Sequence, residues 1–330
     1  MSRAPRVVVL AGGVGGSRFV LGLRSALRSR GVADTASALT VVVNTGDDLW
    51  LSGVRLQPDV DSITYALAGV NDAERGWGRA GDTERVNHEL QAWGSGWPWF
   101  TLGDLDLGTH LARTGWLREG LTPTEVLERM SHRWELGARL LPMTDAEVDT
   151  VVTVRDEDGI RSMHFQEWWT RHRATLEPVS FDNPGVTGVE PAPGVAEVIA
   201  DADVVLLAPS NPVVSIGPIL AVPGVRAALR STAAPVVGVS PIIGGRVVRG
   251  MADVCLAAIG VETSAAAVAA HYGARSGDGL LDSWLIAEED ALAADEVAGL
   301  GIHSVVTPLW MTDAARSAAL AEAALATAAV

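Results

Sequence analysis

The sequence contains no lysine, so all 25 of its basic side chains other than histidine are arginines. The phosphate-binding loop of P-loop ATPases and GTPases ends in Gly-Lys-Ser or Gly-Lys-Thr, and the missing lysine excludes a loop of that type. Acidic residues outnumber the arginines, which gives a net charge of −15. Nucleic acids need basic partners for their phosphates, so we expect no nucleic-acid partner. A small anion can still be bound by backbone amides, by arginine or through a metal ion.

Cysteine and long apolar runs are also scarce. The single cysteine, Cys255, excludes an internal disulfide bond and a zinc site made of cysteines, and its apolar neighbours predict a core position. No run of about 18 uncharged apolar residues occurs, so we expect no membrane span. The first residues lack the apolar segment and cleavage site of a secretory signal. These features favour a cytoplasmic protein.

Tyrosine is rare, with two residues, whereas tryptophan is abundant, with eleven. Most of the tryptophans lie between residues 50 and 169. They could simply fill the core and cover the surface, because aromatic side chains are mainly hydrophobic bulk. The alternative is a pocket that stacks on a flat ring, and composition alone favours the first interpretation.

Short β-branched runs alternate with helical segments along the chain. The runs cover residues 7–10, 40–43, 151–154, 204–207, 236–239 and 304–307. Their continuous apolarity is typical of strands that are buried on both faces of a parallel sheet. The alternation predicts an α/β fold, namely a Rossmann-like, doubly wound domain with a mainly parallel sheet.

Residues 59–148 interrupt this alternation with helical patterns and few strand signals. In this region Ile63, Ala66, Leu67 and Val70 recur at the spacing of one helical face. We therefore expect a Rossmann-like domain made of residues 1–58 and 149–330, and a mostly helical, tryptophan-rich insertion made of residues 59–148. The insertion is expected to cover the active site at the carboxyl end of the sheet, where α/β proteins bind ligands.

A glycine-rich loop, AGGVGGS, joins the first predicted strand to the first predicted helix. Gly12, Gly13, Gly15 and Gly16 allow a sharp turn and a close approach of the backbone to a ligand. The following helix N-terminus offers free N–H groups and the positive end of a dipole, which favour phosphate. A tight turn without a ligand is the alternative, but four glycines at the first βα turn favour nucleotide binding. The spacing does not match G-x-G-x-x-G, which argues against an NAD-dependent oxidoreductase.

Four aspartates lie near the end of the second predicted strand. Asp47 and Asp48 follow that strand, and Asp59 and Asp61 stand at the entrance of a helix. The first two strands are neighbours in the predicted sheet, so these carboxylates should lie at the rim of the glycine loop. Carboxylates repel a phosphate unless a cation lies between them, and Mg²⁺ binds carboxylates together with phosphate oxygens. We expect at least two of the four to bind Mg²⁺, although helix capping or a simple turn remains an alternative for each pair.

Further motifs occur in a fixed order through nearly the whole chain. They are AGGVGGSRF, NTGDDLW, PDVDSITYALAG, GWG, LGDLDLGTHLARTGWL, ARLLPMTD, HFQEWW, APSNPVVSIGPIL and SPIIGG. Together they closely resemble the 2-phospho-L-lactate transferase family of coenzyme F420 biosynthesis. Each piece is weak evidence by itself, whereas the ordered set is highly specific.

This resemblance implies a transferase that joins the deazaflavin Fo (7,8-didemethyl-8-hydroxy-5-deazariboflavin) to a phosphorylated three-carbon acid. The donor is a guanosine diphospho derivative of phosphoenolpyruvate, 2-phospholactate or 3-phosphoglycerate. The terminal ribityl hydroxyl of Fo attacks the donor phosphorus, and GMP leaves. The resemblance also implies Mg²⁺ as cofactor and a homodimer. The arginine- and alanine-rich composition suggests an actinobacterial source, which would favour phosphoenolpyruvate and a dehydro product.

The same resemblance assigns roles to residues of this chain. Asp47, Asp48 and Asp61 would be catalytic, with Asp47 and Asp61 as metal ligands and Asp48 near the Fo hydroxyl. The nucleotide would contact the glycine loop and a polar pair after a later strand, namely Gly12, Gly13, Gly15, Gly16, Ser210 and Asn211. An ordinary Asn-Pro turn is an equal alternative for that polar pair.

Fo would contact Asp48, Asn87 and Trp50. Asn87 departs from the family, which commonly carries a basic residue at this position. Further tryptophans that could stack on the ring are Trp97, Trp99 and Trp168. Arg113 is interpreted as an ordinary arginine on the surface of a helix.

A related group, the YvcK-type proteins, shares the glycine loop and the Asn-Thr-Gly-Asp-Asp stretch. Those proteins resemble nucleotide-sugar-binding regulators rather than transferases. A binding protein of that kind would need neither the tryptophan-rich insertion nor the second pair of aspartates, so the sequence favours the enzyme.

Overall fold

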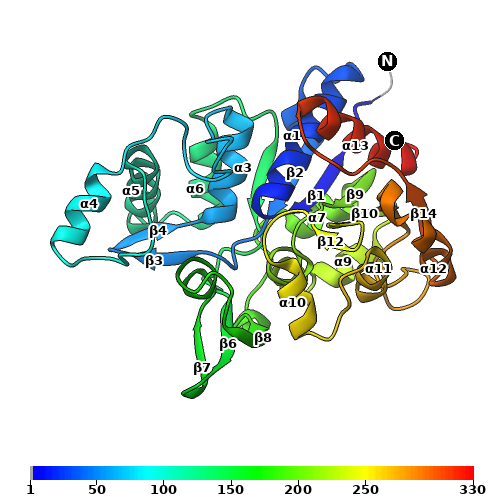
Figure 1. The fold of residues 1–330 in the computed structure, drawn as a ribbon. Helices are drawn as coiled ribbons and strands as arrows, with labels where there is room; N and C mark the ends of the chain where they lie inside the picture. Colours follow the sequence, from blue (N-terminus) through cyan, green and yellow to red (C-terminus); the bar gives the residue numbers. More distant parts are fainter. Residues whose placement is uncertain (1–2) are drawn as a thin grey trace.

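A seven-stranded, all-parallel sheet forms the centre of the protein in a computed structural model that describes residues 3–330 (Figure 1). The order across the sheet is β14-β13-β10-β9-β1-β2-β5. The strands are β1 (Val7–Ala11), β2 (Leu39–Val43), β5 (Arg139–Pro142), β9 (Val204–Leu207), β10 (Val236–Val239), β13 (Ser283–Ile286) and β14 (His303–Val306). This arrangement confirms the Rossmann-like, doubly wound α/β fold.

Both faces of the sheet are buried, as the continuous apolar runs predict. Successive residues of β1 point to opposite faces, so Val8 and Leu10 join one hydrophobic core whereas Val7 and Val9 join the other. The first core lies beneath α7 (Val195–Asp201), α8 (Gly217–Ala221), α9 (Val225–Ser231), α10 (Ala252–Ala258), α11 (Ala265–Tyr272) and α12 (Ala294–Gly299). The second lies beneath α1 (Gly13–Ser29), α3 (Pro58–Ala68) and α13 (Ala314–Thr327).

The insertion forms a separate lobe at the left of Figure 1. This lobe contains three helices of the insertion, α4 (Arg85–Ala92), α5 (Asp104–Arg118) and α6 (Pro123–Ser131). It also contains a hairpin, β3 (Leu49–Leu51) and β4 (Val54–Leu56), which precedes the predicted start of the insertion at residue 59. A small core of its own, which includes Leu51, Leu56 and Leu102, holds the hairpin against α5. Strand β5 lies within residues 59–148 but pairs with β2, so that range also supplies an edge strand of the central sheet.

One predicted strand was assigned to the wrong sheet. Residues 151–154 lie in β6 (Val151–Asp156), which pairs antiparallel with β7 (Gly159–His164) and β8 (Glu177–Asp182) in a separate three-stranded sheet. Only alternate residues of this run, Val152 and Val154, are buried. A short β-branched run therefore looks continuous in sequence although one of its faces is partly exposed.

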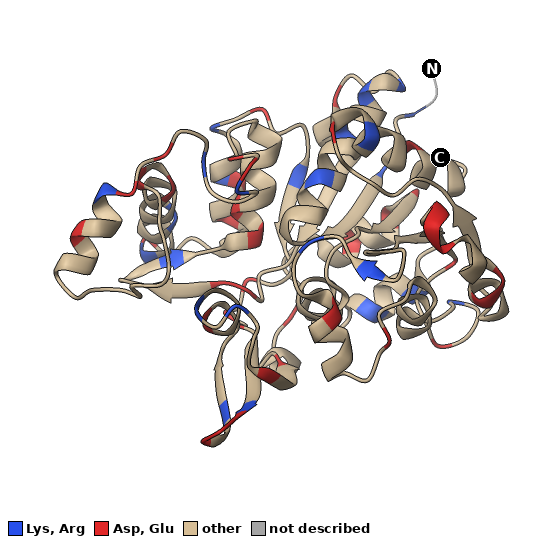
Figure 2. Ribbon diagram, in the orientation of Figure 1, with Lys and Arg blue, Asp and Glu red and all other residues tan. Residues whose placement is uncertain are grey.

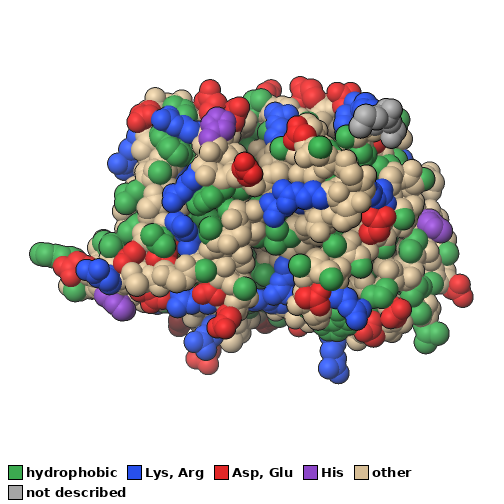
Figure 3. Space-filling model, turned by 90° about the horizontal axis from the view of Figure 1, so that it is seen from above, with side chains coloured by type: hydrophobic (Ala, Val, Ile, Leu, Met, Phe, Trp, Pro, Cys, Tyr) green, Lys and Arg blue, Asp and Glu red, His purple; other side chains and the backbone are tan. Residues whose placement is uncertain are grey.

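Shorter elements complete the chain. They are α2 (Thr35–Ala38), β11 (Ile242–Ile243), β12 (Arg246–Val247), and the irregular helices η1 (Glu167–Arg171), η2 (Val186–Gly188), η3 (Pro212–Ile216) and η4 (Glu288–Ala293). Among the described residues no single helix is long and apolar enough to cross a membrane, and only the bent pair Pro212–Ala221 and Val225–Ser231 reaches that length and apolarity together. Acidic and arginine side chains are interspersed along the chain and on the face seen from above (Figures 2 and 3).

Candidate active site

A cleft of about 880 Å³ opens where the carboxyl ends of the strands face the insertion. The loops that follow β1, β2, β9, β10 and β14 supply one side of the cleft, and the insertion with the segment after β7 supplies much of the other. Ligands of open α/β sheets bind at this end, because all parallel strands direct their carboxyl-terminal loops there.

The glycine loop follows β1 and packs tightly against the loop that follows β9. The hydroxyl of Ser210 accepts a hydrogen bond from the Gly12 N–H at 3.1 Å and donates one to the Gly12 carbonyl at 2.7 Å. A Cβ atom on Gly15 would lie 2.7 Å from the carbonyl oxygen of Pro209, so a larger residue does not fit. Gly13 has φ +64°, a conformation that glycine adopts readily. Ser210, which was expected to contact the nucleotide, thus holds the glycine loop in place.

Gly12, Gly13, Gly15, Ser210 and Asn211 all line the cleft. Asn211 also caps η3, because its side-chain oxygen accepts hydrogen bonds from the next amides, those of Val213 and Val214. Gly16 faces inward, where a Cβ atom would meet Ser210 and Ala11. The tight packing around Gly16 explains the fourth glycine without a ligand contact.

Asp47 and Asp59 form a buried pair of carboxylates at the floor of the cleft. Both lie near the amide nitrogen of Asn44, at 3.4 Å and 2.8 Å respectively. Burial, followed by the nearby charge of Asp59, raises the pKa of Asp47 well above its usual range. Burial likewise raises the pKa of Asp59 to about 6, although hydrogen bonds from Asn44 and Gly13 oppose this shift.

This pair has the donor set that a divalent cation needs. Among the described residues, no arginine or histidine lies within ion-pair distance of Asp47 or Asp59, so their negative charge has no counterion from the protein. Mg²⁺ prefers carboxylate oxygens and binds few of them, leaving room for phosphate oxygens. The sequence left Asp59 open between helix capping and metal binding. The N-cap of α3 is Gln57, so Asp59 lies within the first turn and does not cap the helix.

Asp61 lies two residues further along α3 than Asp59, and it has a counterion. Arg113 of α5 forms a bidentate ion pair with it, and the Nη1–Oδ2 distance is 3.1 Å. The Arg113 side chain is fully buried, so its interpretation as a surface arginine was wrong. The sequence gives no sign of this pair, because the partners are 52 residues apart.

Asp106, His110 and Tyr65 extend this buried network along the cleft. The Tyr65 hydroxyl donates to Asp106 at 2.6 Å, and His110 lies 3.5 Å from both Asp106 and Asp61. Asp61, Asp106 and His110 offer ligand atoms within 4.8 Å of one another, so they form a second group that could hold a metal. The Arg113 guanidinium lies 3.1 Å from the His110 ring and is already paired with the Asp61 carboxylate. Its positive charge therefore disfavours a metal cation between these residues. The Asp47–Asp59 pair is therefore the better candidate for a metal site.

Three residues expected near Fo lie outside this cleft. Asp48 lines a second cavity of about 340 Å³ and accepts a hydrogen bond from Gln57 at 2.7 Å. Trp50 lines the same cavity, and its indole N–H donates to Glu147 at 2.9 Å. Asn87 is buried and accepts a hydrogen bond from the Leu102 amide. Their contacts with Fo stay predictions.

Of the tryptophans expected to stack on the ring, only Trp99 lines the cleft among the described residues. Trp77, Trp99 and Trp169 line the cleft, and Trp97 stacks on Trp99 with ring centres 4.5 Å apart. Trp168 is fully buried in the core beneath β6 and does not line the cleft. Sequence alone cannot tell which of two adjacent tryptophans faces inward.

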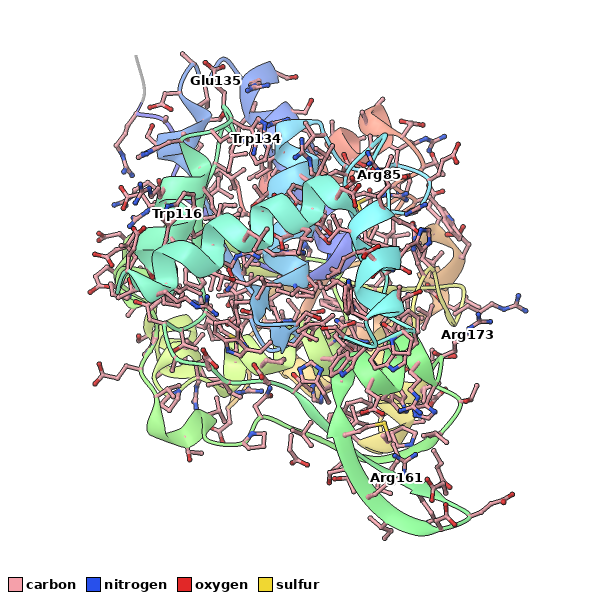
Figure 4. All side chains as sticks on the ribbon, turned by 90° about the vertical axis from the view of Figure 1, so that its left-hand side faces the viewer. Arg85, Trp116, Trp134, Glu135, Arg161 and Arg173 are labelled. Atoms are coloured by element: carbon pink, nitrogen blue, oxygen red, sulfur yellow. The ribbon has the colours of Figure 1, made fainter. Side chains whose placement is uncertain are left out.

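Two further tryptophans of the lobe, Trp116 and Trp134, also lie outside the cleft (Figure 4). They pack beneath the guanidinium groups of Arg129 and Arg133, at 4.7 Å and 4.6 Å from the ring centres. The tryptophans of this region therefore have two roles: some line the cleft, and others pack against arginine side chains outside it.

Fold and site together define a Rossmann-like α/β protein in which a glycine loop and a buried carboxylate pair meet in one large cleft. The model of the family 2-phospho-L-lactate transferase CofD matches residues 7–305 of the chain. The protein belongs to this family of transferases, which confirms the resemblance to the enzymes of coenzyme F420 biosynthesis.

Curated relatives are similar over nearly their full length. A phosphoenolpyruvate transferase from Thermobifida fusca (strain YX) is 52% identical over 321 residues, which cover 97% of each chain. A phosphoenolpyruvate transferase from Mycolicibacterium smegmatis (strain ATCC 700084 / mc(2)155) is 50% identical over 324 residues, covering 97% of this chain and 98% of the relative. These similarities do not favour the alternative of a YvcK-type regulator.

Among solved structures, a UPF0052 family protein from Bacillus halodurans matches with a TM-score of 0.61. The match covers 98% of this chain and all of the other, at 19% identity. At this level of identity the likeness shows the fold alone.

Proposed function

We propose that this protein transfers the phosphoenolpyruvyl group from a guanosine diphospho-donor to the terminal ribityl hydroxyl of Fo, with release of GMP. The observation that carries the proposal is the cleft itself. A glycine loop suited to phosphates, a set of indole rings suited to a flat ring and the buried Asp47–Asp59 pair all line this one cleft. The names of the relatives support phosphoenolpyruvate as the acid, in preference to 2-phospholactate or 3-phosphoglycerate.

The donor would occupy the sheet side of the cleft. Backbone amides at the start of α1 would bind a phosphate, because Gly12, Gly13 and Gly15 line the cleft at the N-terminus of this helix. Ser210 holds the loop in place, so few degrees of freedom are lost when the donor binds.

The acceptor would occupy the insertion side. Trp99 presents an indole face that Trp97 supports from behind, and Trp77 and Trp169 are each more than a third exposed. Exposed indoles in a cleft favour binding of a flat aromatic ring, because burying them against it removes apolar area from water.

Mg²⁺ would be held by Asp47 and Asp59. When bound there, the ion would neutralise the donor phosphates and stabilise the GMP that leaves. Asp61, fixed by Arg113, presents a carboxylate to the cleft that could accept the proton of the attacking hydroxyl. Asp48 faces the second cavity, so Asp61 is the better candidate for this step.

We further propose that the enzyme is a cytoplasmic homodimer. The lack of a disulfide framework is compatible with a reducing compartment, since Cys255 is buried and unpaired. Sedimentation analysis would give the oligomeric state, and a monomer at all concentrations would remove the dimer from the proposal.

The transfer reaction is tested by mixing the protein with Fo, MgCl₂ and each of the three guanylated acids in turn. Release of GMP and the mass of the deazaflavin product are measured. We expect turnover with the phosphoenolpyruvate donor and a dehydro product. No release of GMP with any donor would reject the transferase assignment, and preference for another acid would correct the donor.

Fo binding is measured separately by the fluorescence of its ring. Trp99→Ala should weaken Fo binding, whereas Trp93→Ala, at an exposed indole that directly follows α4 and does not line the cleft, should not. Equal effects of the two substitutions would remove the aromatic wall from the acceptor site.

A further inference from the structure

We propose that three arginines on the rim of the cleft, Arg18, Arg173 and Arg249, form an anion-recognition site for the diphosphate and carboxylate groups of the donor. This proposal rests on the proposed function for the identity of the ligand, but its binding site can be tested without turnover. It also supplies the cation that the lysine-free glycine loop lacks.

Charge in the cleft is divided between floor and rim. The four carboxylates that line it, Asp47, Asp59, Asp61 and Asp106, are all buried. The three arginines that line it are all exposed. An anionic ligand therefore meets guanidinium groups before it reaches the carboxylates. Basic groups at the mouth of a cleft raise the encounter rate of such a ligand.

None of the three arginines has an acidic partner within the described residues. Arg18 contacts only the carbonyl oxygen of Met311, at 3.4 Å, and Arg249 donates to the carbonyl oxygen of Arg75. A neutral carbonyl does not compensate a guanidinium charge. An incoming phosphate or carboxylate would therefore bind it more strongly, because bonds between ionised groups exceed those to neutral acceptors.

The local structure around each arginine differs. Arg18 lies in α1 two residues after Gly16, so it moves with the glycine loop. Arg173 has φ +49° and its neighbour Ala174 has φ +54°, left-handed conformations that are uncommon outside glycine. A hydrogen bond from the Ala174 amide to the carbonyl of Trp168 holds this turn to the core. Figure 4 shows the Arg173 side chain extending from the ribbon into solvent.

Arg249 reaches across the mouth of the cleft to the insertion. A Cβ atom on Gly76 would lie 2.7 Å from its guanidinium group, so glycine at this position permits the approach. The guanidinium fork suits phosphate and carboxylate groups, which it binds with two parallel hydrogen bonds.

Titration calorimetry with two probes, inorganic pyrophosphate and GDP, each with Mg²⁺, tests the site. The variants are Arg18→Gln, Arg173→Gln and Arg249→Gln. The matched controls are Arg171→Gln and Arg246→Gln, which remove the same charge from the same segments but do not line the cleft. We expect each rim variant to weaken binding of both probes about tenfold, since one charged hydrogen-bonded contact is lost. The controls should bind like the unmodified protein, and Fo fluorescence should report unchanged Fo affinity in all five variants.

The outcomes separate this proposal from the proposed function. Weaker probe binding in the rim variants, without transfer to Fo in the unmodified protein, would keep the site and reject the transferase. Normal transfer with rim variants that bind pyrophosphate and GDP as well as the controls do would keep the transferase and reject the site. An equal loss in rim and control variants would also reject the site, because it would reflect overall charge alone.

Discussion

Arg113 and Asp61 form a buried ion pair at the floor of the cleft, with two guanidinium nitrogens on two carboxylate oxygens. The pair joins α5 of the insertion to α3, which packs on α1 of the central domain. It also gives Asp61 a counterion that Asp47 and Asp59 lack. One contact thus serves both the attachment of the lobe and the charge distribution of the site.

Arg113→Met should destabilise the protein strongly. The substitution leaves Asp61 buried without its partner, which typically costs about 3–5 kcal/mol. Urea denaturation gives the free energy of unfolding. Arg118→Gln, on the same helix but exposed, should change it by about 0.5 kcal/mol or less.

The double variant Asp61→Asn/Arg113→Met distinguishes a pair from two independent effects. Because the uncompensated charge is removed together with the arginine, we expect the double variant to be more stable than Arg113→Met alone. A simple sum of the two single effects would contradict the close coupling that the geometry indicates.

Asp47→Asn and Asp59→Asn should each remove the response to Mg²⁺. Loss of groups that merely support a metal ligand costs about 10–100-fold in affinity, so loss of a ligand should cost at least as much. We expect turnover to be abolished and the shift of Tm caused by Mg²⁺ to disappear. Without Mg²⁺ both variants should unfold at a higher temperature than the parent at pH 8, because a buried charge without a counterion has been removed. A normal Mg²⁺ shift in both variants would move the metal to Asp61, Asp106 and His110.

The stability of the metal-free protein should depend on pH in a defined direction. The pKa of Asp59 is about 6 in the folded protein, above its ordinary value, so the folded state binds this proton more tightly than the unfolded chain. The free energy of unfolding should therefore fall as the pH rises from about 4 through about 6, and the raised pKa of Asp47 acts in the same direction. Mg²⁺ should accordingly raise Tm more at pH 8 than at pH 5. Calorimetric scans with and without the ion measure both trends, and a Mg²⁺ effect independent of pH would contradict them.

Gly15→Val should damage donor binding specifically. Gly15 lies at the start of α1, and a valine side chain there would meet the carbonyl oxygen of Pro209, so the loop would have to move. We expect at least a tenfold higher Kd for GDP, since one or more phosphate contacts of the loop would be lost. Fo affinity, measured by ring fluorescence, should stay unchanged. Gly108→Ala is the control, because a Cβ atom there meets open space on α5, and it should stabilise the helix by up to about 1 kcal/mol. Loss of both ligands in Gly15→Val would indicate collapse of the loop.

Local patterns allowed the central elements to be predicted. Val7 and Val41 lie in strands that must be buried on both faces, and such strands have a recognisable composition. The same argument placed Asp47 beside the glycine loop, because β1 and β2 are neighbours. It failed for Val151, since a run of four β-branched residues does not reveal whether one face is covered.

The sequence by itself determined five of the seven strands of the central sheet, the glycine loop and the cluster of aspartates at its edge. These depend on neighbours in the chain and on the rule that parallel strands direct their ends to one side. Only the tertiary structure decided that Asp47 faces the cleft whereas Asp48 faces the second cavity. It alone paired Asp61 with Arg113 and buried Trp168. The direction of a side chain at a loop, and its partner from a distant helix, depend on how the two lobes pack, and no local pattern encodes that packing.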